Sequence, residues 1–204
     1  MKLLELFSGT GSVGAVAKDL GYSVVSLDLK NADINCDILN WDYKKYEVKH
    51  FDFIWASPPC TEYSRAKTTG VRKLDEANRI VLKTVEIIKY FQPRWWVIEN
   101  PQTGLLKRQP FMDEFDFVDV DYCKYGMPYR KRTRLWNNLV ELKPRDLCKR
   151  DCGNIVDGKH KETAQRMPSG RKSEWGDNYI LHKQDDLYKI PRALIYDILG
   201  GVGV

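Results

Sequence analysis

The sequence has no apolar run long enough to span a bilayer, and its first residues lack the charged, apolar and small-residue pattern of a secretory signal peptide. It also lacks an even set of cysteines. The five thiols argue against a secreted disulfide framework and favour free cysteines in a reducing compartment. We therefore expect a protein without a membrane partner that is not secreted and acts in the cytoplasm or elsewhere inside the cell.

Length and charge limit the remaining classes. The 204 residues are 43% hydrophobic, which is enough for one domain with a full core. The net charge of +5 is a mild excess, and Lys and Arg are concentrated between residues 124 and 172. This distribution is compatible with a nucleic acid partner but does not establish one.

Strand and helix patterns alternate from the first residues onward, which is typical of βαβ units. We therefore predict an α/β fold with a doubly wound, mostly parallel sheet. Periodicity is lost at 141–186, which we interpret as a small, loop-rich basic insertion between a 1–140 domain and a 187–204 segment that returns to it. The predicted strands are 2–6, 22–27, 32–38, 51–55, 94–99, 115–122 and 133–139, and the predicted helices are 13–20, 74–91 and 189–199.

A glycine-bearing turn, Phe7-Ser8-Gly9-Thr10-Gly11, follows the first predicted strand. Glycines there let the backbone turn sharply and approach a ligand closely. Asp28 ends the next strand, where an acid usually binds ribose hydroxyls. Because the loop has no P-loop lysine, it indicates a nucleoside-type cofactor without phosphates; a purely structural turn is the alternative. Asp37 and Ile38 end the third strand and are candidates to hold an adenine ring, or else lie on the surface.

Two further predicted strand ends carry side chains that could take part in catalysis. Pro58-Pro59-Cys60 follows an apolar strand and forms a stiff turn, which would hold one thiol at the carboxyl edge of the sheet. Taken alone, the motif is equally compatible with Cys60 as a catalytic thiol and as a free core cysteine. Glu99 ends the strand that contains Trp95 and Trp96, at the same edge. A partly desolvated carboxyl there would share or donate a proton, unless it only interacts with a following helix dipole.

A basic run, Tyr129 to Trp136, follows. Alternation along a strand would place Arg130, Arg132 and Arg134 on one face and Lys131 and Thr133 on the other. Three guanidinium groups in a row suit phosphates or carboxylates, although a charge run is more often a solvated face.

Cys148, Cys152 and His160 in the basic insertion, with His182 beyond them, form an irregular set of possible zinc ligands. No fourth ligand is obvious, so we predict no metal, and we interpret Cys123 as a core or edge thiol.

In this order, the motifs resemble the cytosine-5 DNA methyltransferases, which use S-adenosylmethionine. That family has a Phe-x-Gly-x-Gly loop, an acid after the second strand, an Asp after the third, Pro-Pro-Cys, Glu-Asn-Val and Gln-x-Arg-x-Arg. The resemblance covers about residues 1–138 and 187–199, where Leu187-Tyr188-Lys189-Ile190-Pro191 is similar to the last family motif. It implies a Rossmann-like methyltransferase fold and transfer of a methyl group to carbon 5 of cytosine in double-stranded DNA.

The resemblance also implies roles for individual residues. Cys60 would attack carbon 6 of a flipped-out cytosine, Glu99 would bind the ring, and Arg132 and Arg134 would hold the base and lower the thiol pKa. S-adenosylmethionine would contact Phe7, Ser8, Gly9, Thr10, Gly11, Asp28, Leu29, Asp37, Ile38 and Ser57. Nucleic acid would contact Arg130, Lys131, Lys159, Lys161, Arg166 and Arg171.

The chain departs from the family pattern at several places. Thr61 replaces the glutamine after Pro-Pro-Cys, Pro101 replaces the valine of Glu-Asn-Val, and Arg130 stands where we place the glutamine of the arginine motif. The target-recognition region is short, which favours a short recognition sequence, low specificity, a specificity partner or self-association. Such a small enzyme suits a restriction-modification system, a phage or a virus. RNA cytosine-5 methylation and a catalytically silent nucleic-acid-binding module are the alternatives.

Overall fold

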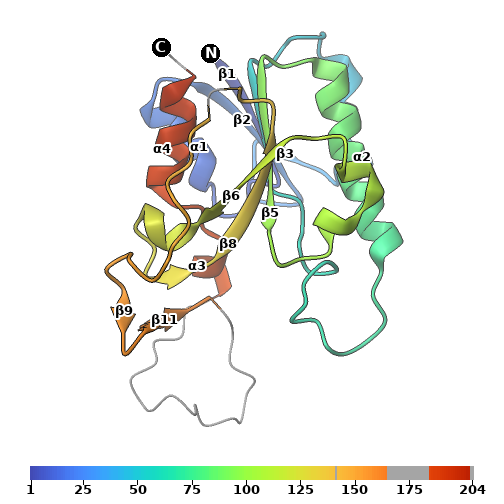
Figure 1. Ribbon diagram of the computed structural model, residues 1–204. Coiled ribbons are helices and arrows are strands. Elements are labelled where there is room, and N and C mark those ends of the chain that lie inside the picture. Colours follow the sequence, from blue (N-terminus) through green and yellow to red (C-terminus); the bar gives the residue numbers. More distant parts are fainter. Residues whose placement is uncertain (141, 165–183, 203–204) are drawn as a thin grey trace.

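The computed structural model describes residues 1–140, 142–164 and 184–202. Seven strands form the central sheet in the order β3-β2-β1-β4-β5-β8-β6 (Figure 1). The strands from β3 to β5 in this order are parallel, and β8 runs antiparallel to both β5 and β6. Their bounds are β1 Lys2–Leu6, β2 Ser23–Asp28, β3 Ile34–Asn35, β4 Phe53–Ala56, β5 Trp95–Pro101, β6 Phe117–Asp121 and β8 Arg132–Asn137. The predicted doubly wound, mostly parallel sheet is confirmed.

Helices cover both faces of the sheet. Figure 1 shows α1 (Ser12–Asp19) and α4 (Arg192–Gly201) on one side and α2 (Leu74–Phe91) on the other. The sequence of β1 explains this arrangement, because consecutive side chains point to opposite faces. Leu4 packs in the core under α2, whereas Leu3 packs with α1 and α4.

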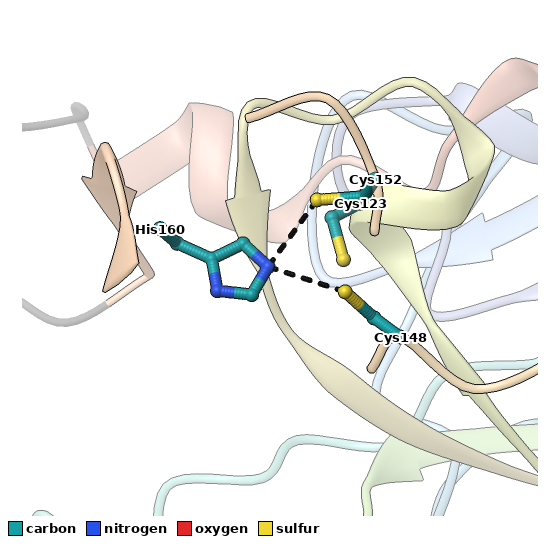
Figure 2. A group of neighbouring side chains, drawn as sticks. All are labelled: Cys123, Cys148, Cys152 and His160. Carbon is teal, nitrogen blue, oxygen red and sulfur yellow. Dashed lines mark hydrogen bonds between the residues drawn. The ribbon is translucent and has the colours of Figure 1, made fainter. Parts of the chain in front are cut away.

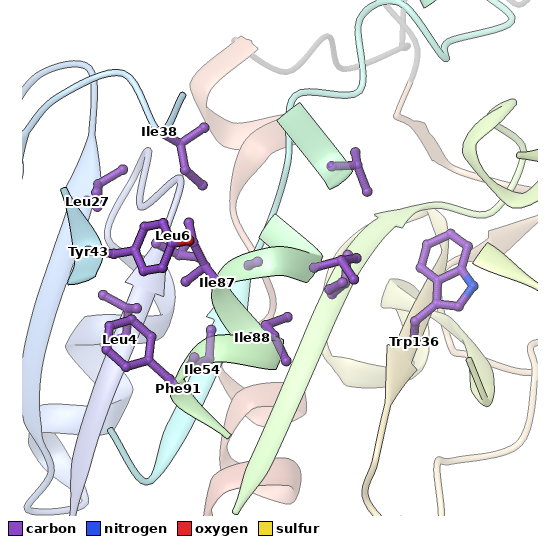
Figure 3. Packing of buried hydrophobic residues seen from close by; sticks show 14 of the residues in the cluster. Leu4, Leu6, Leu27, Ile38, Tyr43, Ile54, Ile87, Ile88, Phe91 and Trp136 are labelled. Atoms are coloured by element: carbon purple, nitrogen blue, oxygen red, sulfur yellow. The ribbon is translucent and has the colours of Figure 1, made fainter. Parts of the chain in front are cut away.

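The larger core lies between the sheet and α2, and Figure 3 shows part of it. Ile54 from β4 and Ile88 and Phe91 from α2 meet there with Tyr43 from the short 3-10 helix η1 (Tyr43–Lys45). Each fully buried side chain of this size contributes roughly 1.5–3 kcal/mol. The predicted bounds of α2 are confirmed: Asp75 and Glu76 favour its amino end, and Gln92 ends it in the left-handed conformation.

Two elements differ from the prediction. The strand expected at 32–38 is only β3, because the side chain of Asp33 accepts hydrogen bonds from the N–H and hydroxyl of Ser26 and turns the chain. The helix expected from residue 189 begins at Arg192, since Pro191 is extended and acts as its N-cap. No helix in the described ranges is long and apolar enough to cross a membrane.

Short elements lie between the strands of the sheet and within the basic insertion. The 3-10 helices η2 (Leu106–Arg108) and η3 (Pro110–Met112) precede β6, and η4 (Tyr122–Tyr125) follows it. Within 142–164, β9 (Ile155–Val156) and β10 (Lys159–His160) form an antiparallel hairpin. β11 (Glu162–Thr163) pairs with β7 (Tyr129–Arg130), and α3 (Gln184–Tyr188) precedes α4. The described part of the insertion is therefore built from two-residue strands and loops, as its composition predicted.

Gly14 allows the closest packing of α1 on β1. A Cβ atom at Gly14 would lie 2.6 Å from Oε2 of Glu5 and 3.3 Å from Cγ1 of Val24. We predict that Gly14→Ala lowers the free energy of unfolding by roughly 1–3 kcal/mol, measured by urea denaturation.

The matched control is Gly200→Ala in α4, where an added Cβ would meet nothing within 4 Å. This change should be neutral or stabilise the helix by about 0.5–1 kcal/mol, because alanine loses less backbone entropy. Equal effects of the two substitutions would contradict a steric role for Gly14.

Candidate active site at the carboxyl edge of the sheet

A cavity of about 600 Å³ opens at the carboxyl ends of β1, β2, β4 and β5. It lies where β2 and β4 flank β1 on opposite sides, which is the usual place for ligands in open α/β sheets. The structure brings nine of the predicted site residues to its wall. These are Phe7, Ser8, Gly9, Thr10, Asp28, Ser57, Cys60, Glu99 and Lys131.

The glycine loop turns sharply because three of its residues have positive φ angles: Phe7 at 61°, Gly9 at 47° and Gly11 at 67°. The N–H groups of Phe7 and Ser8 both donate to the carbonyl of Leu27, at 2.8 and 3.2 Å. The carboxylate of Asp28 accepts the N–H of Gly9 at 2.9 Å. The loop is therefore held against the end of β2, with Ser8 and Thr10 on the cavity wall.

Glu5 occupies the amino end of α1. Its carboxyl oxygens accept the N–H groups of Val13 at 3.3 Å and Gly14 at 3.0 Å. Burial raises the pKa of Glu5 to about 7, although these two hydrogen bonds act in the opposite direction. A phosphate would need the same N–H groups. The site is therefore built for a ligand without phosphates at this position.

The Pro-Pro-Cys turn is fixed from two sides. The N–H of Ser57 donates to the carbonyl of Leu6 at 3.2 Å, and the amide of Asn100 donates to the carbonyl of Pro58 at 2.9 Å. Asn100 is 1% exposed, so this bond forms away from water. Burial and the nearby Glu99 raise the pKa of the Cys60 thiol, and Lys131 opposes them. Cys60 is thus held mainly as a neutral thiol beside one carboxyl and one ammonium group.

Glu99 and Lys131 are connected through Tyr122. The Tyr122 hydroxyl donates to Oε1 of Glu99 at 3.0 Å, and both residues are buried. Lys131 Nζ lies 5.0 Å from the centre of the Tyr122 ring and donates to the carbonyl of Leu187 at 3.0 Å. These contacts join β5, η4, the β7–β8 segment and the C-terminal return at the cavity.

The predicted alternation of the basic run is confirmed, but Arg132 and Arg134 do not line the cavity. Arg132 forms two hydrogen bonds with Asp121, at 3.0 and 2.7 Å, and Arg130 lies 3.4 Å from the same carboxylate. Arg134 is paired in the same way with Asp119. These partners lie directly opposite on β6, so Arg132 and Arg134 serve cross-strand ion pairs, and Lys131 lines the cavity instead.

Several predicted cofactor residues also lie elsewhere. Ile38 is 3% exposed in the core, Leu29 is 71% exposed, and Asp37 accepts the N–H of Leu39. None of the three lines the cavity. Gly11 is the N-cap of α1 and does not line the cavity.

The remaining predicted nucleic acid contacts fall in two groups. Lys159 and Lys161 are exposed in and after β10 of the insertion. Arg166 and Arg171, like His182, lie outside the described residues.

Sequence reasoning missed some of the cavity wall. Asn100 follows Glu99, but only the fold shows its bond to Pro58. The C-terminal return contributes Asp185, Tyr188 and Ile190 to the cavity wall. The last family motif had indicated this segment but no roles for its individual residues. The other missed wall residues are Glu5, Ser12, Lys30 and Asn31.

Comparison with known proteins decides the family. The C-5 cytosine-specific DNA methylase family matches residues 1–110. A probable DNA (cytosine-5)-methyltransferase of Frog virus 3 (isolate Goorha) is 33% identical over 219 residues, covering 98% of this chain and 99% of the viral protein. This chain belongs to the C-5 cytosine-specific DNA methylase family. It is therefore an enzyme of the DNA cytosine-5 methyltransferase class, and its cofactor is S-adenosylmethionine.

More distant relatives are larger. The type II methyltransferase M.AgeI of Thalassovita gelatinovora is 25% identical over 166 residues, but these cover only 38% of that protein. The structure of the Entamoeba histolytica methyltransferase EhMeth matches with a TM-score of 0.55 at 16% identity, over 72% of this chain and 56% of that chain. S. pombe Dnmt2 matches with a TM-score of 0.51 at 16% identity, over 72% and 54%. These structures share the Rossmann-like methyltransferase fold.

The residues present fit S-adenosylmethionine. The cofactor carries a nucleoside but no phosphate, and Glu5 already occupies the N–H groups that a phosphate would need. Asp28 and the hydroxyls of Ser8 and Thr10 supply polar groups on the cavity wall for a ribose and an amino acid moiety. When bound, the cofactor supplies an electrophilic methyl group.

The raised pKa of Glu5 predicts a pH-dependent stability. Between about pH 4.5 and 7 the folded chain keeps the Glu5 proton that the unfolded chain has lost, so stability falls as the pH rises, by up to about 3 kcal/mol. Glu5→Gln removes this ionisation, at the cost of one hydrogen bond of about 1 kcal/mol. Urea denaturation from pH 4.5 to 8 should show a smaller decline for the variant. Parallel curves for the two proteins would contradict the assignment to Glu5.

The charges around Cys60 predict opposite effects on thiol reactivity. Glu99→Gln removes a neighbouring negative charge and should speed iodoacetamide labelling of Cys60 by about two- to tenfold at pH 8. Lys131→Met should slow it by a similar factor. Labelling is followed by mass spectrometry of the Cys60 peptide, with Lys89→Met on the exposed face of α2 as control. Changes in the same direction for both variants would contradict this arrangement.

Proposed function

We propose that the chain methylates carbon 5 of cytosine in DNA through a covalent bond between Cys60 and the base. The observation that carries this proposal is the meeting of Cys60, Glu99 and Lys131 on the wall of the cavity that also contains the glycine loop. A nucleophile, a hydrogen-bonding carboxyl and a cation thus share one site with the cofactor residues.

Cys60 acts as the nucleophile. Carbon 5 of cytosine is a poor nucleophile, and addition of a thiolate at carbon 6 moves electron density to carbon 5, where the methyl group is then accepted. The demethylated cofactor is the leaving group of the transfer. Loss of the proton from carbon 5 to solvent then restores the double bond and releases the thiolate. Because burial keeps the Cys60 pKa high in the free protein, the thiol must be deprotonated as the base binds.

Glu99 binds the pyrimidine ring. Its Oε1 accepts the Tyr122 hydroxyl, which orients the carboxyl group and leaves Oε2 and the second lone pair of Oε1 for the base. In its protonated form the carboxyl donates to the ring nitrogen, and its oxygen accepts from the exocyclic amino group. The bond to the ring nitrogen withdraws electrons from the ring while Cys60 adds to it, and the contact with the amino group orients the base.

Lys131 takes the role that the sequence motif had suggested for Arg132 and Arg134. It opposes the rise in the Cys60 pKa, and the carbonyl of Leu187 and the ring of Tyr122 hold its ammonium group. Arg132 and Arg134 instead hold β8 against β6. They support the position of Lys131 without contacting the base.

Double-stranded DNA is the substrate we favour. The Frog virus 3 relative aligns with this chain over 99% of its own length, and it is named a probable DNA (cytosine-5)-methyltransferase. A cytosine within a duplex must leave the base stack before Cys60 can reach it, which is the general solution for methyltransferases. Exposed Lys159 and Lys161 are suited to contact phosphates of a nucleic acid. A specificity partner or self-association would compensate for the short insertion.

The test is methyl transfer from radiolabelled S-adenosylmethionine to unmethylated duplex DNA, with digestion and chromatography to identify 5-methylcytosine. We expect transfer by the wild type and by Cys36→Ser, a control thiol outside the cavity. Cys60→Ser should lose activity by several orders of magnitude, and Lys131→Met by about 100-fold.

Three outcomes would contradict parts of the proposal. Transfer to RNA but not to DNA would assign the alternative substrate, because the chemistry of the two reactions is the same. Full activity of Cys60→Ser would exclude the covalent route. Duplex DNA containing 5-fluorocytosine should trap a covalent complex with the wild type, and turnover without such a complex would also exclude Cys60 as nucleophile.

A further inference from the structure

Four potential metal ligands from three separate segments converge outside the active-site cavity. Cys123 lies in η4, Cys148 and Cys152 lie in the loop that follows residue 145, and His160 lies in β10. Their ligand atoms all lie within 4.8 Å of one another, and Figure 2 shows the four side chains pointing toward a common centre. Nε2 of His160 lies 3.5 Å from Sγ of Cys148 and 3.4 Å from Sγ of Cys152.

We propose that Cys123, Cys148, Cys152 and His160 bind a structural zinc ion with tetrahedral geometry. Around such an ion, Zn–S bonds of about 2.3 Å and Zn–N bonds of about 2.0 Å place the ligand atoms about 3.5–3.8 Å apart. The two nitrogen-to-sulfur distances agree with this spacing. Cysteine and histidine ligands select zinc over magnesium or calcium, and four protein ligands leave no open position for catalysis.

Cys123 changes the interpretation of this region. The sequence suggested Cys148, Cys152 and His160, with His182 beyond them, and the absence of an obvious fourth ligand was the reason to predict no metal. The fourth ligand comes from η4, directly after β6 and outside the insertion. A disulfide is a poorer explanation, because it would pair two of the three sulfurs and leave the third beside the imidazole. All five cysteines of the chain are free in the structure.

The backbone around the cluster is shaped to present these side chains. Sγ of Cys148 accepts the N–H of Arg150 at 3.3 Å, and such a bond stabilises a metal-bound thiolate. Arg150 adopts a φ angle of 70°, which a non-glycine residue keeps only where its surroundings require it. Asp157 and Gly158, both with positive φ, form the tight turn of the β9–β10 hairpin that carries His160.

The insertion needs such a link because it has almost no core. Within the described residues 142–164, Cys148 is the one buried residue. Its strands are two residues long, so neither apolar burial nor sheet pairing can hold this segment in place. Zinc binding would supply the free energy that holds the insertion in place. It would also fasten the insertion to η4, directly after β6.

The position of the cluster connects it to the active site. The N–H of Cys148 donates to Asp121 at 2.9 Å, and Asp121 holds Arg132 on β8. Cys123 directly follows Tyr122, whose hydroxyl binds Glu99. The zinc ion would therefore fix the insertion next to the β6–β8 edge, close to the segment that carries Lys131.

The first test is the metal content of the full-length protein, expressed with zinc in the medium and measured by inductively coupled plasma mass spectrometry. We expect one zinc ion per chain in the wild type and in Cys36→Ser, a matched control outside the cluster. The double variant Cys148→Ser/Cys152→Ser should contain none. His160→Cys should keep the ion, since four thiolates also bind zinc tetrahedrally.

A second measurement keeps the test decisive if the double variant fails to fold. Zinc is removed from the wild type with a chelator, and cobalt(II) alone is added. We expect the thiolate-to-cobalt charge-transfer band and the intense visible bands of tetrahedral coordination, with displacement of cobalt by added zinc. Removal of zinc should also speed proteolysis within 142–164 in the wild type.

Two results would overturn the proposal: a wild type that lacks zinc and gives no thiolate–cobalt band, or a folded double variant that keeps one zinc ion. None of these readouts depends on methyl transfer, so they stand whether or not the proposed activity is found.

Discussion

The buried carboxylate of Asp121 joins the parts of the molecule that define the site. It is 0% exposed and receives Arg132 from β8, Arg130 from β7 and the N–H of Cys148 from the insertion. Burial alone would raise the pKa of Asp121, but the hydrogen bonds from Arg132 and Cys148 outweigh it and hold the pKa below its usual value. Without these donors an uncompensated charge would remain in the protein interior, which is strongly destabilising. This requirement explains why Arg132 is committed to the scaffold and Lys131, one residue earlier, faces the cavity.

Much of the fold could be predicted from the sequence because its elements carry local signals. The period of 3.6 along α2 and the apolar runs of β1 and β4 depend only on neighbouring residues. The face of the basic strand could not be predicted in the same way. Alternation shows that Arg132 and Arg134 share a face, but only the pairing of β8 with β5 and β6 determines which face meets the cavity.

The residues of the candidate site also fall into those that local sequence signals predict and those that depend on tertiary contacts. Cys60, Glu99 and Asp28 were predictable because each ends a strand, and the ends of parallel strands meet at one edge of the sheet. The bond from Asn100 to Pro58 and the place of Tyr188 on the cavity wall depend on contacts between distant segments. Cys123 belongs to this second group, since it is 25 residues from Cys148 in the chain and nothing in its local sequence marks it as a partner.

Glu5 has a consequence for ligand competition. ATP shares its adenosine with S-adenosylmethionine but carries a triphosphate. Above about pH 7 the ionised Glu5 places a negative charge at the helix end where nucleotide-binding folds usually hold a phosphate. The carboxylate would repel a triphosphate placed there. One buried side chain would thus favour the phosphate-free adenosine compound over the triphosphate.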